Sequence, residues 1–223
     1  MAVPDQRRSV PDLTFPWSII GILAVSSIVL AGVARGSGTL WIDARATGFV
    51  QGLDGRGFSI VADIGNTLGE SRYAGILLAI LIALTIITKR WRDLTFLVVL
   101  LALRSAGTVL KGLIDSPRPT SDVAEAVRAF DGFGFPSGHS MTSAVAVGGI
   151  VFLALRCKNS PAVRLTLAVA WLLCVTLTAF ARIWVGAHWL TDTVGGTVIG
   201  VAIVLLSANL SALATSRSAT LDS

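Results

Sequence analysis

Charged side chains are scarce in this chain. Asp, Glu, Lys and Arg make up 14% of its 223 residues, whereas a soluble domain carries roughly a quarter. Hydrophobic residues make up 53%, and the mean hydropathy is +0.76. Several apolar runs approach the roughly 20 residues that span a bilayer as a helix. The composition therefore disfavours a soluble helical protein and indicates an integral membrane protein.

Cysteine and clustered carboxylates are also nearly absent. The two cysteines, Cys157 and Cys174, lie at the end of one apolar run and inside another, with no CxxC or other metal-binding spacing. They predict apolar packing, and no disulfide framework. No group of carboxylates is suited to Mg²⁺, so we expect neither a metal nor another cofactor. The net charge of +5 lies largely in short loops between apolar runs, which disfavours nucleic-acid binding.

Six apolar runs predict transmembrane helices and thus an all-α polytopic membrane protein. The second run is the least regular, and its helix is predicted to extend back through Asp63 to Asn66 as a partly buried segment. No repeat or soluble second domain is visible, so residues 1–223 form one domain with a core of about 17–213. The predicted spans are 17–34, 69–88, 94–113, 137–155, 163–180 and 194–213.

The few polar residues at the ends of these runs form three clusters. We call them the Lys–Arg cluster, the Ser–Gly–His cluster and the Arg–His–Asp cluster. Both histidines of the chain lie in them. Such retention of cations and imidazoles in a lipid-soluble chain indicates an active site. The members are, in order, Lys111 with Arg118-Pro119; Pro136-Ser137-Gly138-His139; and Arg182, His188 and Asp192.

The charges of the loops predict the orientation of the chain in the membrane. Basic residues gather at one set of helix ends, which the positive-inside rule assigns to the cytoplasm together with both termini. Following the spans from there brings all three clusters to the extracytoplasmic face. The assigned cytoplasmic residues are Arg7, Arg8, Lys89, Arg90, Arg92, Arg156, Lys158, Arg164 and Arg217; the other side has Arg35, Arg45 and Arg56, diluted by Asp43 and Asp54. Trp41 and Phe49 are predicted at the headgroup level on that side.

The first two clusters are suited to an oxyanion. Lys111 offers a point charge and Arg118 a planar fork held near two prolines; contact with anionic headgroups is the alternative. Ser137 is a candidate N-cap, and Gly138 lets the backbone approach a ligand, so that a helix N-terminus would face an anion next to His139. A helix start with an uninvolved histidine is the alternative there.

The Arg–His–Asp cluster has the spacing of an oriented base or nucleophile. His188 and Asp192 stand four residues apart, so on a helix the carboxylate could accept one imidazole N–H and raise the basicity of the other nitrogen. Asp192 could also cap a last helix that begins at Thr193.

Together the three clusters resemble the type 2 phosphatidic acid phosphatase superfamily, whose motifs are K-x6-RP, PSGH and SR-x5-H-x3-D. The resemblance covers about 17–213, and its one departure is Ala181, where the family has serine. It implies a metal-independent phosphatase with a phosphohistidine intermediate. His188 would be the nucleophile, Asp192 would orient it and His139 would be the general acid and base. Phosphate would be bound by Lys111, Arg118, Ser137, Gly138 and Arg182.

The resemblance also implies the substrate class. We expect a bacterial plasma-membrane enzyme that removes the terminal phosphate of a lipid phosphate or pyrophosphate, with undecaprenyl pyrophosphate or phosphatidylglycerol phosphate as the favoured substrates. A lipid phosphotransferase with the same intermediate stays open, as does a non-catalytic lipid carrier, although the retained histidines disfavour the latter. The spans disfavour a soluble vanadium-dependent haloperoxidase.

Arg104 is predicted to lie near the middle of the membrane. It lies seven residues before Lys111, on nearly the same helix face and roughly 10 Å deeper. An intramembrane arginine is a functional candidate, but an ion pair with Asp63 or Glu70 is the simpler interpretation. We therefore leave Arg104 outside the catalytic set.

Overall fold

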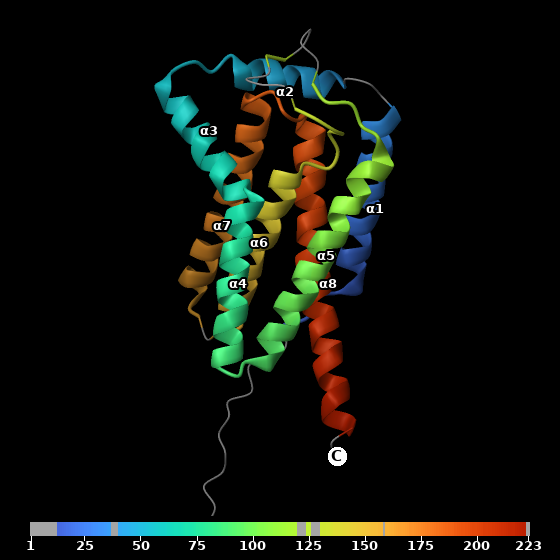
Figure 1. The fold of residues 1–223 in the computed structure, drawn as a ribbon, viewed down its shortest axis with the longest axis vertical. Helices are drawn as coiled ribbons and strands as arrows, with labels where there is room; N and C mark the ends of the chain where they lie inside the picture. Colours follow the sequence, from blue (N-terminus) through green and yellow to red (C-terminus); the bar gives the residue numbers. More distant parts are fainter. Residues whose placement is uncertain (1–12, 37–39, 120–123, 126–129, 158, 222–223) are drawn as a thin grey trace, which may run out of the picture.

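The computed structural model is a bundle of long helices with a short helix across one end (Figure 1). It describes the chain apart from residues 1–12, 37–39, 120–123, 126–129, 158 and 222–223. The predicted basic residues Arg7, Arg8 and Lys158 lie outside the described residues. The helices in the described part are α1 (Trp17–Gly36), α2 (Trp41–Gln51), α3 (Arg56–Gly69), α4 (Ser71–Ile87), α5 (Trp91–Ile114), α6 (Gly138–Leu155), α7 (Pro161–Trp184) and α8 (Leu190–Leu221).

The six predicted spans correspond to these long helices. Five helices, α1, α5, α6, α7 and α8, are each long and apolar enough to cross a membrane. The candidate for the sixth span is the pair α3 and α4, which are bent by 47° at Glu70. The helix does extend back beyond residue 69, as predicted, but with a sharp break. The all-α polytopic fold is confirmed.

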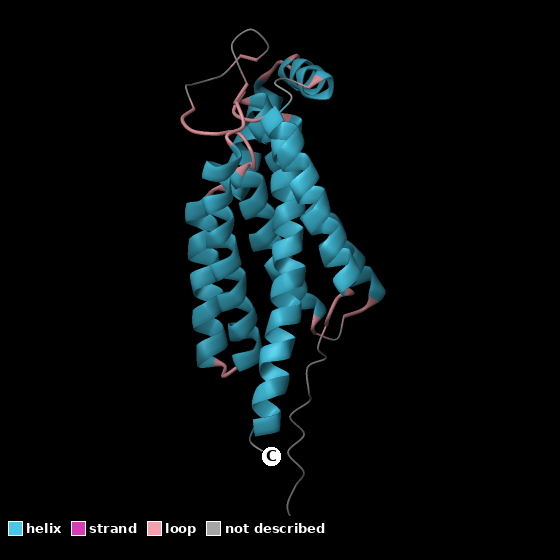
Figure 2. Ribbon diagram, turned by 90° about the vertical axis from the view of Figure 1, so that its right-hand side faces the viewer, coloured by secondary structure: helices cyan, strands magenta, loops and turns pink. Residues whose placement is uncertain are grey.

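Helix α8 forms the centre of the bundle and packs against α1, α5, α6 and α7. Its Ile203 belongs to a buried cluster with Leu100 of α5 and Met141 and Val145 of α6. Figure 2 shows the same bundle from the side, with α8 extending beyond its neighbours at one end. The start of α8 and the start of α6 lie at the opposite end, next to each other.

Glycines on α8 allow α6 to approach closely. A Cβ added at Gly196 would lie 2.5 Å from the carbonyl oxygen of Ser137, and one at Gly200 would lie 2.6 Å from Ala144 Cβ. Real Cβ atoms do not come so near their neighbours, so only glycine fits at these positions. The first turns of α6 and α8 are thereby held together, which brings the Ser–Gly–His cluster to the Arg–His–Asp cluster.

Helix α2 lies across the end of the bundle that carries these helix starts (Figures 1 and 2). Its buried Asp43 accepts hydrogen bonds from the backbone N–H and the hydroxyl of Thr191, both at 2.9 Å. Trp41 and Phe49 on the same helix are 70% and 72% exposed. One face of α2 is therefore bonded to the start of α8, while its large aromatic side chains remain available to a surrounding bilayer.

Helix α3 packs on α7 at backbone distance, and this contact can be tested at Gly65. A Cβ added there would lie 2.1 Å from the carbonyl oxygen of Leu177. We predict that Gly65→Ala lowers the free energy of unfolding by about 1–3 kcal/mol, as overpacking does. The measurement is the thermal unfolding midpoint of the purified protein in detergent.

The matched control is Gly57→Ala, also in α3, where an added Cβ meets no atom within 4 Å. Alanine should leave stability there unchanged or raise it by about 0.4–1 kcal/mol. Equal midpoints for the two variants would contradict the close α3–α7 contact.

Candidate active site

The Ser–Gly–His cluster opens α6 as predicted. Ser137 is the N-cap: its buried Oγ accepts from the backbone N–H of Ser140 at 3.5 Å and from the Ser140 hydroxyl at 3.2 Å. Gly138 follows, and a Cβ added there would meet no atom within 4 Å. The open space beside Gly138 lies at a helix N-terminus, where free N–H groups and the helix dipole favour an anion.

Backbone hydrogen bonds join this cluster to the Arg–His–Asp cluster. The N–H of Ser137 donates to the carbonyl oxygen of Asp192 at 3.0 Å. Gly134, three residues earlier, packs so closely that an added Cβ would lie 2.7 Å from Asp192 Oδ2. Its own N–H donates to the carbonyl oxygen of Ser116 at 2.8 Å. The loop that follows the Lys–Arg cluster is thus packed against the carboxylate of Asp192.

Asp192 contacts His188 directly. Its Oδ2 lies 3.3 Å from His188 Nδ1 and also accepts the backbone N–H of Trp189 at 3.1 Å. Both side chains are buried, His188 at 2% and Asp192 at 0% exposure. Helix α8 begins at Leu190, not at Thr193 as predicted, and Asp192 is its third residue. The carboxylate therefore caps the helix from inside its first turn, in the manner of a capping box, and orients the imidazole as well.

His188 itself precedes the helix, in contrast to the predicted shared helix face. Helix α7 ends at Trp184, and Gly186 turns the chain with a φ of +68°, a conformation that favours glycine. The N–H groups of Ala187 and His188 both donate to the carbonyl oxygen of Arg182, at 3.0 and 3.2 Å. This compact turn brings His188 back over Asp192.

The geometry selects one tautomer of His188. A carboxylate accepts hydrogen bonds, so Nδ1 carries the proton and the lone pair of Nε2 is left available. Burial lowers the pKa of His188 well below its ordinary value, and the positive charges of Lys111, Arg182 and Arg118 lower it further. A neutral imidazole with a free Nε2 is the form that acts as a nucleophile.

Arg182 is held by a residue that sequence reasoning did not assign. Its side chain is 5% exposed, and Nη1 donates to Asn66 Oδ1 of α3 at 2.8 Å. The guanidinium also lies over the ring of Phe130, 5.4 Å from its centroid. An amide on the predicted partly buried segment 63–66 was the only sequence signal for this contact.

The two cations of the Lys–Arg cluster differ in their surroundings. Arg118 donates to three backbone carbonyls: Nε to Gly132 at 2.9 Å, Nη1 to Ala187 at 2.6 Å and Nη2 to Asp131 at 3.0 Å. Arg118 therefore holds its own loop against Ala187, the residue before His188. Its guanidinium is not fully available to an oxyanion, as the sequence had predicted it would be. The ammonium of Lys111 has no hydrogen bond or ion pair with any described residue, and its charge acts on His188.

His139 has an acidic neighbour, Glu70. Its Nε2 lies 3.5 Å from Glu70 Oε2, at the break between α3 and α4. Gly69 permits this approach, because an added Cβ would lie 2.7 Å from His139 Cβ. The sequence suggested Glu70 only as a partner of Arg104, and this was wrong.

Arg104 instead contacts the first turns of α6. Its Nη2 donates to Thr142 Oγ1 at 2.6 Å and to the carbonyl oxygen of Gly138 at 3.4 Å. No carboxylate pairs with it among the described residues. The ion pair with Asp63 or Glu70 is therefore not formed, and Arg104 lies next to the Ser–Gly–His cluster.

Ala181, the one departure from the motif, is fully buried. It faces Gly65, where an added Cβ would lie 2.8 Å from Ala181 Cβ. The position is thus part of the close α3–α7 contact. The described residues contain no group of three His, Cys, Asp or Glu side chains arranged to hold a metal ion.

The sequence matches the model of the PAP2 superfamily over residues 92–215, which include all three clusters. The chain belongs to the PAP2 superfamily. It falls in the membrane phosphatase branch of that family, as the resemblance of its motifs predicted.

The chain is also similar to a relative in sequence and to solved structures in fold. The chain is 32% identical over 122 residues to phosphatidylglycerophosphatase B of Bacillus subtilis, a match that covers 53% of the chain and 57% of that relative. Its fold is similar to the crystal structure of a transmembrane PAP2-type phosphatidylglycerolphosphate phosphatase from the same species, with a TM-score of 0.73, 23% identity and coverage of 86% and 94% of the two chains. Aquifex aeolicus LpxE is similar with a TM-score of 0.61, 18% identity and coverage of 78% and 98%.

The protonation of His188 can be measured directly, because the chain has only two histidines. We predict that His188 stays a neutral Nδ1–H tautomer well below the ordinary histidine pKa of about 6.5. Lys111→Met should raise its pKa, since one of the charges that lower it is removed. Imidazole nitrogen shifts in labelled protein report both effects, and His139→Gln assigns the signals.

The same shift affects stability with a defined sign. The unfolded chain binds a proton at His188 below about pH 6.5, whereas the folded chain does not until a lower pH, so stability falls as the pH drops below about 6.5. A His188 signal that titrates at or above pH 6.5 would contradict the buried, cation-lined site.

Proposed function

We propose that this protein hydrolyses the terminal phosphate of a membrane lipid phosphate through a phosphohistidine on His188. The observation that carries the proposal is the buried contact between His188 Nδ1 and Asp192 Oδ2, which leaves Nε2 available beside three cationic side chains. Membership of the PAP2 superfamily supports the same reaction.

In the first step, Nε2 of His188 attacks phosphorus in line with the bond to the lipid oxygen. The N–P bond forms as the P–O bond breaks, and Asp192 stabilises the cationic ring that results. Lys111, Arg118 and Arg182, with the free N–H groups at the start of α6, neutralise the equatorial oxygens. For Arg118 this requires the N–H groups that it does not already donate to carbonyls.

His139 acts as an acid in the first step and as a base in the second. It first donates its proton to the departing lipid oxygen, and then removes a proton from the water that attacks phosphorus. The O–P bond to water forms as the N–P bond breaks, so phosphate leaves and His188 returns to the neutral form. Glu70, 3.5 Å from His139 Nε2, holds the imidazole in place.

The substrate we propose is a lipid whose head bears a terminal phosphate, with phosphatidylglycerol phosphate favoured over undecaprenyl pyrophosphate. The curated relative named for phosphatidylglycerol phosphate chemistry supports this order. A site at the end of a bundle of spanning helices suits a lipid whose tail stays in the bilayer during hydrolysis.

We also propose that the site faces away from the cytoplasm. Described basic residues at the end of the bundle opposite the site include Lys89, Arg90, Arg92 and Arg164. By the positive-inside rule this end is cytoplasmic, and the start of α1 and the end of α8 lie there, so we propose that both termini are cytoplasmic.

Turnover is tested by phosphate release from phosphatidylglycerol phosphate by the purified protein in the presence of EDTA. Wild type should release phosphate without added metal. His188→Asn should lower kcat by at least about 1,000-fold, because a chemical step is lost. Phosphate release by His188→Asn at the wild-type rate would exclude His188 as the nucleophile.

The separate role of His139 is tested with p-nitrophenyl phosphate, whose leaving group needs no proton. His139→Gln should form the phosphohistidine but hydrolyse it slowly, so phosphorylated protein accumulates. The phosphoryl group should be lost in acid and kept in base, as is typical of phosphohistidine. His188→Asn is the matched control and should show no label. A label in both variants would place the covalent intermediate elsewhere.

Orientation is tested with reporter fusions. A green fluorescent protein joined to the C-terminus should fluoresce in bacterial cells, because this reporter folds in the cytoplasm. Alkaline phosphatase joined there should be inactive, because it is active only outside the cytoplasm. Alkaline phosphatase inserted in the α2–α3 connection at Asp54 should be active. The reverse pattern would contradict the proposed orientation but not the chemistry.

A further inference from the structure

A groove enters the bundle between α4, α5 and α6, directly below the His139–Glu70 pair. It has a volume of about 270 Å³. Its mouth is formed by exposed residues that include Gly75, Leu101 and Ser105, and its floor by the buried Leu78 and Val145. Because α4 and α5 belong to membrane spans, the mouth opens toward lipid.

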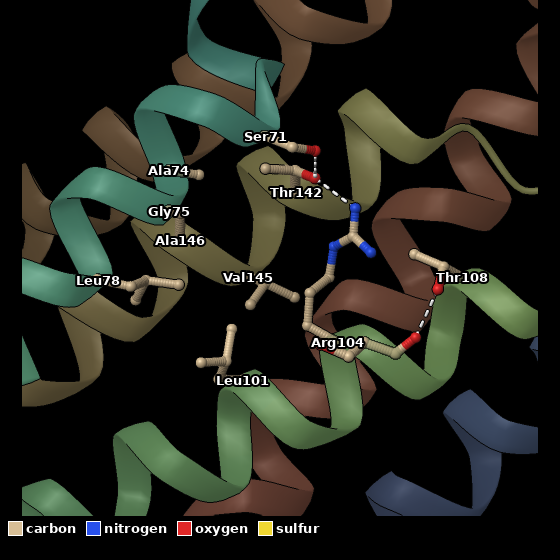
Figure 3. Close-up of a pocket in the computed structure, with 11 residues that line it drawn as sticks. Ser71, Ala74, Gly75, Leu78, Leu101, Arg104, Thr108, Thr142, Val145 and Ala146 are labelled. Carbon is tan, nitrogen blue, oxygen red and sulfur yellow. Dashed lines mark hydrogen bonds between the residues drawn. The ribbon is translucent and has the colours of Figure 1, made fainter.

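The groove is polar at one end and apolar at the other (Figure 3). Ser71, Thr142 and Arg104 lie at the polar end, joined by hydrogen bonds from Arg104 to Thr142 at 2.6 Å and between Thr142 and Ser71 at 3.4 Å. Ser105 and Thr108 add two hydroxyls to the lining, and the remaining side chains are aliphatic or small. This is the polarity profile of a lipid, with an anionic part at the top and acyl or prenyl chains below.

The polar end lies on the leaving-group side of the reaction. Glu70 precedes Ser71, and His139 lies one turn before Thr142, so both polar rim residues are next to the general acid and its partner. In the proposed mechanism His139 donates its proton to the lipid oxygen. The part of the substrate that continues from this oxygen toward the tail therefore passes Arg104.

Arg104 has unused hydrogen-bonding capacity at that place. Its Nη2 bonds to Thr142 and Gly138, but its buried Nε has no hydrogen-bond partner in the described part of the chain. Nη1 likewise has no partner among the described residues. A guanidinium with free donors on two nitrogens, next to no carboxylate, matches an oxyanion with two oxygens.

We propose that Arg104 binds a second phosphate, the one retained in the lipid product, and so determines the substrate class. The favoured substrate is a lipid with a phosphate between the scissile ester and the tail. A lipid monophosphate such as phosphatidic acid leaves Arg104 without an anion inside the membrane, which is costly. This inference rests on the proposed function and adds the recognition of the leaving group.

The test compares kcat/KM for three lipids in mixed micelles. Phosphatidylglycerol phosphate has its second phosphate one glycerol away, a polyprenyl diphosphate has it directly bonded, and phosphatidic acid has none. Arg104→Gln should lower the ratio of kcat/KM for the preferred two-phosphate lipid to that for phosphatidic acid by about 10-fold or more, as loss of a charged hydrogen bond does. The lipid whose kcat/KM falls most identifies the distance between the two phosphates that Arg104 recognises.

Two further variants separate recognition from structure. Arg104→Lys keeps the charge and should restore part of the ratio. Arg72→Gln makes the same change on an exposed position of α4 outside the groove lining and should leave the ratio at the wild-type value. An equal loss for all three lipids with Arg104→Gln, or an altered ratio with Arg72→Gln, would overturn the proposal.

Binding to His188→Asn protein gives a readout that does not require turnover. Adding Arg104→Gln to this background should weaken binding of the preferred two-phosphate lipid more than that of phosphatidic acid. If Arg104→Gln selectively weakens binding of the two-phosphate lipid but wild type releases no phosphate, only the proposed function is refuted. Equal binding losses together with normal turnover would refute the role of Arg104 alone.

Discussion

The carboxylate of Asp192 is the contact on which the site depends. It accepts the N–H of Trp189, which closes the first turn of α8, and the same oxygen faces Nδ1 of His188. The backbone carbonyl of this residue accepts the N–H of Ser137, the N-cap of α6. One residue therefore sets the start of two helices and the tautomer of His188. Stability and reactivity are coupled there, because a change at Asp192 disturbs a buried helix junction as well as the imidazole.

The cations around this junction have different degrees of freedom. Arg118 is bonded to three carbonyls, whereas Lys111 has no such bond among the described residues. Together with burial, which is the larger cause, their charges lower the pKa of His188 and keep it neutral before substrate arrives. The proposed phosphohistidine cation becomes tolerable only when the anionic phosphoryl group offsets their charge. The substrate thus supplies part of the electrostatic balance that its own hydrolysis requires.

Much of the fold and site could be predicted from sequence because lipid imposes simple rules. Apolar length gave the spans, and three polar clusters gave His139, His188 and Asp192. The contacts that were missed are tertiary: Asn66 on Arg182 and Glu70 on His139 lie more than 60 residues from their partners, and no local pattern relates them. The start of α8 was placed three residues late because the capping carboxylate stands inside the first turn. The predicted topology placed Asp63 and Glu70 near Arg104 and suggested an ion pair. The side chain of Arg104 instead extends to α6, which the order of the helices does not reveal.

The bond between Asp43 and Thr191 has a consequence for how the enzyme sits in its membrane. Helix α2 carries Trp41 and Phe49 as exposed aromatic side chains, and we predict that they lie at the headgroup level. The same helix is bonded to the residue that precedes Asp192. We therefore infer that the depth of His188 in the bilayer is set relative to the headgroup level. Membranes of different thickness would then leave His188 at the same distance from the headgroups, because α2 is positioned by the interface and not by the midplane.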